Sequence, residues 1–340
     1  MFALLICLTL AAEPADWEKA EEPYLKDIKQ LTHEFVRAGE GYFAPDGKQI
    51  IFQAEEKDTG NPFYQIFTMD LATGKTTRVS PGVGKTTCSY FRPDGKKIIF
   101  ASSHLDPDAK KHHEEEYEQR KADQKAGIHR RYKWDFDPHM DIFEANPDGV
   151  GLKRLTGGKG YNAEGSYSPD GKQIVFCSNR DGNLELYIMD ADGKSVRQLT
   201  HAPKCYNGGP FFSPDGKRVI FRSDRKKPDH LQIYVINADG TGEKALTDDP
   251  DWVQWGPYWY DEHHIVYAGA DHSDPKARPN YDLYWMNIDT GKKVRLTYAP
   301  GADVLPVFSP DKKKLMWTST RDGRRSAQLY IADFTAPKDH

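Results

Sequence analysis

Short segments in which apolar and polar residues alternate recur along the chain, each built around a turn-forming group. The copy from Phe211 reads FFSPDGKRVIF, and related copies begin at Tyr42, Tyr90, Ser166, Tyr258 and Val307. Alternation with a period of two is typical of strands, and Pro-Asp-Gly is typical of tight turns because Pro fixes φ and Gly accepts a positive φ. The six copies therefore predict six antiparallel hairpins.

A second block follows each hairpin and supplies two more strands. It reads LYIMDADGKSVRQLT where it ends at Thr200, and IYVINADGTGEKALT where it ends at Thr247. Four antiparallel strands that recur in this way predict one blade of a β-propeller. The chain is thus expected to be an all-β, six-bladed β-propeller with four-stranded antiparallel blades. The expected blades cover residues 40–80, 87–156, 162–200, 207–247, 254–297 and 303–334.

The last copy lacks a closing strand, and the other end of the chain offers one. The sixth block stops near Phe334 without the Leu-Thr ending, whereas residues 28–32 (IKQLT) precede the first copy. We expect residues 28–32 to form the outermost strand of the last blade, because closing the ring removes two strand edges that would otherwise template aggregation. A single propeller domain then spans residues 28–334.

Three motifs resemble the repeats of the TolB-like (PD-type repeat) β-propeller family. They are the S-P-D-G-K strand, the I-Y-x-x-x-x-D-G turn, and the loops Ser178-Asn179-Arg180 and Ser223-Asp224-Arg225. The resemblance covers residues 28–334 and implies the six-bladed fold, which hosts many different functions. The α/β domain that precedes the propeller of TolB itself is not expected here, because few residues lie between the start of the mature chain and Ile28.

The start of the chain, MFALLICLTLAA, is an apolar stretch that is too short to span a bilayer. It is typical of a secretory signal, so residues 1–12 are expected to be removed and the protein to be periplasmic or secreted, with no membrane span. A buried N-terminal strand and a misassigned start codon are the alternatives. After export Cys88, Cys177 and Cys205 would remain, which allows at most one disulfide.

Composition and missing motifs narrow the function. The 340 residues are 38% hydrophobic and 29% charged, with a net charge of −4, so nucleic-acid binding is not expected. The sequence contains no G-x-S-x-G elbow, Walker A loop or dinucleotide fingerprint. The Ser of the S-P-D-G turns recurs with the repeat, which indicates a structural role. The residues therefore favour binding over catalysis.

In a propeller the innermost strands line a central channel, and ligands approach the face where these strands begin. The candidate ligand-binding residues at this face are Glu40, Glu164, Asn207, Arg222, Trp255 and Asp303. Glu40 and Glu164 are two carboxylates that could hold a hard cation or exchange a proton. Alternatively, they are polar residues of a wet channel without a task.

Blade 2 carries an insertion at residues 104–139, where the other blades have shorter loops. Its first half is rich in Ala, Glu, Lys, Gln and Arg and is expected to be helical. Its second half, IHRRYKWDFDPHMD, is aromatic and acidic, and large exposed aromatic side chains are a liability. We expect this half to fold over the channel mouth as a lid that adds Tyr132 and Trp134 to the ligand site.

Histidines and aspartates from the long loops of blades 2 and 5 could converge on a divalent metal such as Ca, Zn or Mn. The candidate ligands are His104, Asp137, His139, Asp271 and His272. No H-E-x-x-H or comparable spacing accompanies them, and no other cofactor is expected.

The favoured function is an exported binding or scaffold module, expected to be a monomer, that holds a protein, peptide or glycan of the cell envelope on its lidded channel face. The alternative is a metal-dependent lyase or hydrolase that acts on a polysaccharide or peptide at the channel mouth. A third possibility is an accessory subunit whose lid docks into a larger envelope complex.

Overall fold

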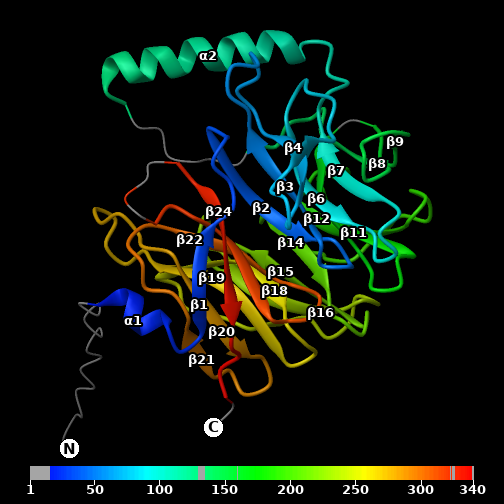
Figure 1. The fold of residues 1–340 in the computed structure, drawn as a ribbon. Helices are drawn as coiled ribbons and strands as arrows, with labels where there is room; N and C mark the ends of the chain where they lie inside the picture. The colour runs from blue at the N-terminus through cyan, green and yellow to red at the C-terminus, as the bar shows by residue number, and fades with distance from the viewer. Residues whose placement is uncertain (1–15, 129–134, 159, 322, 324–325, 339–340) are drawn as a thin grey trace, which may run out of the picture.

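The computed structural model describes residues 16–128, 135–158, 160–321, 323 and 326–338, and their strands form six sheets of four antiparallel strands (Figure 1). Blades 1 and 2 consist of β2 (Arg37–Phe43), β3 (Gln49–Glu55), β4 (Gln65–Asp70), β5 (Thr76–Arg78), β6 (Thr86–Phe91), β7 (Ile98–Ser102), β8 (Asp141–Ala145) and β9 (Lys153–Arg154). Blades 3 and 4 consist of β10 (Asn162–Tyr167), β11 (Gln173–Ser178), β12 (Glu185–Asp190), β13 (Arg197–Gln198), β14 (Asn207–Phe212), β15 (Arg218–Ser223), β16 (Gln232–Asn237) and β17 (Lys244–Ala245). Blades 5 and 6 consist of β18 (Trp252–Trp259), β19 (His264–Asp271), β20 (Asp282–Asn287), β21 (Lys293–Arg295), β22 (Asp303–Phe308), β23 (Lys314–Ser319), β24 (Gln328–Phe334) and β1 (Leu25–Gln30).

The first strand of each repeat is the innermost strand of its blade. The strands β2, β6, β10, β14, β18 and β22 contact one another in ring order, and β22 contacts β2 again. The prediction of an all-β, six-bladed propeller is therefore confirmed, and the innermost strands surround a central axis.

The strand β1 closes the ring as the fourth strand of blade 6. It pairs antiparallel with β24, with Leu25 opposite Phe334 and Gln30 opposite Tyr330, and the two strands lie side by side although they come from opposite ends of the chain (Figure 1). The predicted closure is confirmed, but β1 lies earlier than residues 28–32. The reason is that Leu25 is buried against blade 6, whereas Thr32 leaves the ladder and makes a different contact.

A Ser or Thr hydroxyl fastens the end of the fourth strand to the third strand in every blade. In blade 3 the Thr200 hydroxyl accepts a hydrogen bond from the Leu186 N–H at 2.9 Å. In blade 6 the residue in this place is Thr32, which accepts from the Leu329 N–H at 3.0 Å and donates to Gln328 at 2.7 Å. The recurring Leu-Thr ending is therefore a clamp, and the N-terminal segment supplies it to blade 6.

The core of each blade contains a cross-strand pair of aromatic rings from its second and third strands. The six pairs are Phe52–Phe67, Phe100–Phe143, Phe176–Tyr187, Phe221–Tyr234, Tyr267–Tyr284 and Trp317–Tyr330. Such pairs contribute about 0.5–1.5 kcal/mol each beyond the burial of their area. Because every blade has one, stability is distributed around the ring.

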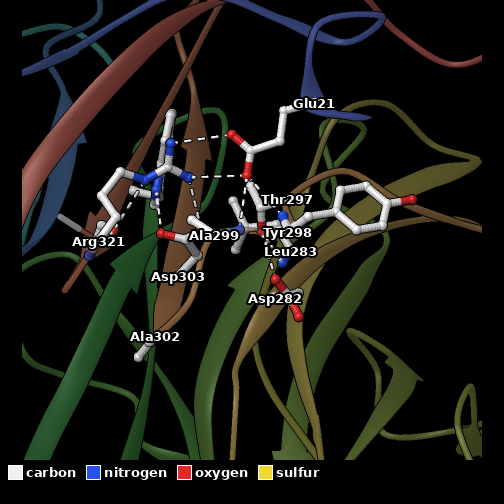
Figure 2. Close-up of polar contacts among 12 residues, drawn as sticks. Glu21, Asp282, Leu283, Thr297, Tyr298, Ala299, Ala302, Asp303 and Arg321 are labelled. Atoms are coloured by element: carbon white, nitrogen blue, oxygen red, sulfur yellow. Dashed lines mark hydrogen bonds and ion pairs between the residues drawn. The ribbon is translucent and has the colours of Figure 1, made fainter. Parts of the chain in front are cut away.

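The helix α1 (Trp17–Glu21) ties the segment before β1 to blades 5 and 6. Glu21 is fully buried, and its carboxylate accepts a hydrogen bond from the Tyr298 N–H at 2.7 Å. The Arg321 guanidinium lies between the carboxylates of Glu21 and Asp303, at 3.1 and 2.8 Å (Figure 2). Buried charges are tolerated when each has a partner, so this network fixes α1 to the ring.

The insertion of blade 2 contains the predicted helix, α2 (Ala109–Ala126), which extends along the outside of the propeller (Figure 1). Arg120 connects it to blade 1, where its guanidinium lies 2.7 Å from the Glu55 carboxylate and 2.8 Å from the Pro62 carbonyl oxygen. His113 Nε2 accepts a hydrogen bond from the Gly84 N–H at 3.1 Å. Most of the helix surface is exposed, so these few contacts hold it in place.

Two findings in the described residues concern the expected absence of a membrane span and the pairing of the cysteines. No helix among the described residues is long and apolar enough to cross a membrane. Cys88, Cys177 and Cys205 are free thiols. The expected signal segment, residues 1–12, lies outside the described residues.

Candidate functional site

Each innermost strand contains a β-bulge, and one residue in each bulge has a positive φ. The six bulge residues are Glu40, Cys88, Glu164, Gly209, Gly256 and Leu305. Gly adopts this conformation freely, whereas a side chain is disfavoured there by about 1–2 kcal/mol. Two blades have Gly at this position, whereas Glu40 and Glu164 adopt the same positive φ although it is unfavourable for them. Residues with such an unfavourable backbone conformation are common at functional sites.

The six bulge residues line a central cavity of about 400 Å³. Its other walls are mostly apolar and aromatic. Tyr64 and Tyr281, which directly precede the third strands of blades 1 and 5, lie on its wall together with Trp255. A cavity of this size and lining is typical of sites that bind small molecules or single side chains.

A layer of aromatic rings closes one end of the cavity. Tyr42, Tyr90, Phe211 and Tyr258 each follow a bulge residue by two positions, and neighbouring ring centroids in this layer lie 5.1–6.3 Å apart. Phe211 and Tyr258 also line a separate pocket among the Pro-Asp-Gly turns. The layer therefore separates the turn face from the cavity, which lies toward the face where the innermost strands begin.

A buried ion pair forms one wall of the cavity. Arg222 Nη2 lies 2.8 Å from Glu164 Oε2. The Glu164 carboxylate also accepts hydrogen bonds from the hydroxyls of Tyr161 at 3.1 Å and Tyr206 at 2.7 Å, and from the Gly209 N–H at 2.6 Å. Burial holds the pKa of Tyr206 well above its ordinary value, so this phenol stays protonated and donates. The Glu164 carboxylate therefore has an ion-pair partner and several hydrogen-bond donors.

Two glycines in blade 4 make room for this cluster. A Cβ on Gly208 would collide with the Tyr206 hydroxyl, and a Cβ on Gly209 would collide with the Arg222 guanidinium. The Gly-Gly sequence of blade 4 is thus required by the side chains packed against it.

Glu40 faces the same cavity but has no ion-pair partner in the part of the chain that the structure describes. The Tyr42 hydroxyl lies 3.5 Å from Glu40 Oε1. Burial raises the pKa of Glu40 to about 7; the positive charge of Arg222 opposes this shift, and the negative charge of Glu164 adds to it. Glu40 is therefore a carboxyl that can gain or lose a proton near neutral pH.

The repeats match a known family. The family described as the TolB beta propeller domain (PD40) matches residues 150–276. The matched segment lies within blades 2 to 5 of the propeller. Among curated proteins, an uncharacterized protein of Agrobacterium fabrum is 39% identical over 64 residues, which is 19% of this chain and 22% of that protein. The match thus spans about a fifth of the length of that relative.

Solved structures show the same fold around the full ring. A structure provisionally assigned as TolB from Agrobacterium tumefaciens superposes with a TM-score of 0.60 at 18% identity, covering 91% of this chain and 97% of the other. TolB from Acinetobacter baumannii gives 0.55 at 20%, covering 90% and 66%. An oligogalacturonate lyase from Vibrio parahaemolyticus gives 0.54 at 16%, covering 90% and 93%. At such identities the likeness is one of fold.

Four of the six candidate channel residues of this propeller line the cavity. They are Glu40, Glu164, Arg222 and Trp255. The Arg222 guanidinium lies 5.6 Å from the ring centroid of Trp255, so the two form part of one wall.

The placement of Asn207 and Asp303 in the ligand site is wrong. Both are buried away from the cavity, at 0% and 1% exposure. Asn207 Oδ1 accepts a hydrogen bond from the Arg225 guanidinium at 2.5 Å, and Asp303 accepts from Arg321 and, at 2.9 Å, from Trp317 Nε1. These polar residues at the start of innermost strands hold the loop arginines of their own blades.

The candidate metal ligands of blade 2 make separate contacts. His104 packs against the ring of Phe143, with centroids 4.4 Å apart. The Asp137 carboxylate lies 3.1 Å from Lys85 Nζ, and His139 is exposed. None of the three enters the central cavity.

The candidates of blade 5 are equally separate. His272 Nε2 lies 2.8 Å from the Tyr281 hydroxyl, and Asp271 accepts a hydrogen bond from the Ser273 N–H at 2.8 Å. Blades 2 and 5 stand opposite each other in a ring of six, so their peripheral loops do not meet. Among the described residues no group of three His, Cys, Asp or Glu could hold a metal ion, so the predicted convergence is not found.

The aromatic half of the insertion touches the ion-pair cluster from outside. The Phe136 ring lies 5.4 Å from that of Tyr161 and 5.9 Å from that of Tyr206. Tyr132 and Trp134 lie outside the described residues, so their placement in the ligand site stays a prediction. No residue of 104–139 that the structure describes lines the cavity itself.

Sequence reasoning missed three residues of the site. Tyr161 and Tyr206 hold the Glu164 carboxylate, and Ser89 is part of the cavity lining. A signal for the tyrosines was present, because Tyr-Asn occurs directly before the innermost strand in both blade 3 and blade 4. Ser89 carried no comparable signal.

Proposed function

We propose that this propeller is a binding module that takes a segment of a partner protein into its central cavity. The observation that carries the proposal is the cavity itself, which is walled mostly by apolar and aromatic side chains and closed at one end by the aromatic layer. Polar side chains are the smaller part of the lining and include Glu40, Gln53, Arg222 and Thr318. Sites of this kind bind by burying apolar surface and use a few polar groups to orient the ligand.

A protein segment suits this lining better than a glycan does. Each sugar unit carries several hydroxyls, and a buried hydroxyl without a hydrogen-bond partner is costly. The few polar groups of the cavity cannot satisfy many hydroxyls, whereas apolar side chains of a protein segment need no such partners. Phe136, which is 38% exposed above Tyr161 and Tyr206, offers a further apolar contact for a partner.

We further propose that the protein is exported as a monomer and meets its partner in the cell envelope. The apolar residues 1–12 support export. The pairing of β1 with β24 supports a monomer, because it covers the strand edge through which a second copy could add.

The metal-dependent lyase remains the alternative, but no specific observation favours it. The likeness to an oligogalacturonate lyase is one of fold. No three of the candidate ligands converge among the described residues, and the cavity lining combines carboxylates with aromatic residues rather than with histidines.

Selection of peptides from a random library tests the proposal. Val304 lines the cavity, and Val304→Trp would fill part of it. Val150 is 63% exposed, so Val150→Trp is the matched control. Peptides selected on the wild-type protein should bind Val304→Trp at least about tenfold more weakly, a loss of about 1.4 kcal/mol, and should bind Val150→Trp unchanged.

Either of two results would contradict the proposal. One is that no peptide is selected on a protein that is folded by circular dichroism. The other is that the selected peptides bind the Val304→Trp variant as tightly as the wild type, which would place their site outside the cavity.

A further inference from the structure

The charges that line the central cavity do not cancel. Glu164 and Arg222 neutralise each other at 2.8 Å, which leaves Glu40 as a carboxyl without an ion-pair partner among the described residues. When Glu40 is ionised, the charged groups of the lining sum to a net negative charge, and the rest of the lining is mostly apolar and aromatic. An uncompensated charge is unfavourable in such surroundings, and a cationic group of a ligand would compensate it.

We infer that the cavity holds its ligand by a primary ammonium group that pairs with the Glu40 carboxylate. This inference rests on the proposed binding function and adds the chemical class of the group that is bound. An ammonium group has three N–H donors, and the two oxygens of the Glu40 carboxylate offer acceptors for two of them. Aromatic faces attract cations, and the ring of Tyr281 also lines the cavity.

Other charged groups fit this lining less well. An anion would meet the uncompensated Glu40, and the charge of Arg222 is already matched by Glu164. A metal ion needs several converging hard ligands, which the described residues do not supply. A guanidinium has five donors in one plane, more than the single carboxylate of Glu40 can accept.

Proton release provides a signature other than affinity. Burial raises the pKa of Glu40 to about 7, opposed by Arg222 of β15 and reinforced by Glu164 of β10, while Cys88 of β6 and Tyr42 of β2 donate toward it. Below this pH the carboxyl is mostly protonated and must ionise to pair with an ammonium group. Binding should therefore release protons near pH 6 and weaken as the pH falls toward 5.

The test compares three four-carbon probes that differ in charge: n-butylammonium, n-butanol and butyrate. Each is titrated into the full chain near pH 7.5, with chemical-shift changes giving the dissociation constant, and calorimetry near pH 6 in buffers of different ionisation enthalpy counts the protons. n-Butylammonium should bind at least about tenfold more tightly than the other two and should release protons.

Variants show which residue is responsible. Glu40→Gln should weaken n-butylammonium binding at least about tenfold and abolish proton release. Glu34→Gln is the matched control, because it removes an exposed carboxylate of the same blade and should change neither quantity.

Two results would overturn the inference while leaving the proposed function intact. One is equal binding of all three probes, and the other is unchanged n-butylammonium binding in Glu40→Gln. If no probe binds and the peptide selection also finds no ligand in the cavity, both the inference and the proposed function fail.

Discussion

Arg222 Nη2 lies 2.8 Å from Glu164 Oε2, and the two residues come from adjacent blades. Glu164 is the bulge residue of β10 in blade 3, whereas Arg222 is in β15, the second strand of blade 4. They are 5% and 8% exposed. The ion pair therefore joins two blades at the wall of the cavity.

Removing one partner of this pair should destabilise the protein strongly. Arg222→Met is expected to lower the free energy of unfolding by about 3–5 kcal/mol, because it leaves the Glu164 carboxylate buried without a countercharge. Adding Glu164→Gln should recover part of the loss. Urea unfolding of the single and double variants measures both effects, and a loss below about 1 kcal/mol in Arg222→Met would show that the pair is not structural.

Glu40 should make the folded protein less stable as the pH rises. Burial raises its pKa from an ordinary 4.5 to about 7, so between these values the folded state binds more protons than the unfolded state. The stability lost on going from pH 5 to pH 8 is at most about 3 kcal/mol. Relative to the wild type, Glu40→Gln should thus gain stability over this range in urea unfolding. A stability difference that is the same at both pH values would argue against the raised pKa, and Glu34→Gln is the control.

The positions of the residues around the cavity could be predicted from the repeats, but which of their carboxylates is ion-paired could not. Aligned copies place Glu40 and Glu164 at one position of the innermost strand, and the structure gives both a positive φ. The alignment does not distinguish them. Glu164 is paired because Arg222 from the next blade reaches it, and such a contact between blades is not visible in a repeat.

Loss of the closing strand should expose a sheet edge. Deletion of residues 1–32 removes β1 and the Thr32 hydroxyl, so β24 would present unpaired N–H and C=O groups. We expect oligomers in light scattering and a lower melting temperature. Thr32→Val alone should cost about 1–2 kcal/mol, as should Thr247→Val at the same place in blade 4. A monodisperse monomer with an unchanged melting temperature after the deletion would contradict closure by β1.

Polar residues at the ends of strands were the hardest to interpret from the sequence. Asn207 and Asp303 occupy channel-facing positions in the repeat, yet they bind Arg225 and Arg321 inside their blades. Glu21 gave no signal, because a five-residue helix has no periodicity, and only the folded ring brings it to Arg321 (Figure 2). In each case the acid or amide is held by a hydrogen bond or an ion pair to an arginine.

The position of α2 should depend on one side chain. Arg120 joins the helix to Glu55 and Pro62 of blade 1, and few residues of α2 are buried. Arg120→Ala is therefore expected to speed hydrogen exchange across residues 109–126 at least about tenfold, with little change in melting temperature. Lys121→Ala is the control, since the ion pair of Lys121 with Glu118 is exposed at the surface. Equal exchange in both variants would mean that other contacts hold the helix.

The most direct test of the central cavity as the ligand site is fluorine NMR with 5-fluorotryptophan. The chain has seven Trp residues, and Trp255 lines the cavity, so its resonance can be assigned with Trp255→Phe. On addition of n-butylammonium or a selected peptide, the Trp255 resonance should shift more than any other. A ligand that binds while the Trp255 resonance stays in place would contradict the cavity as the binding site.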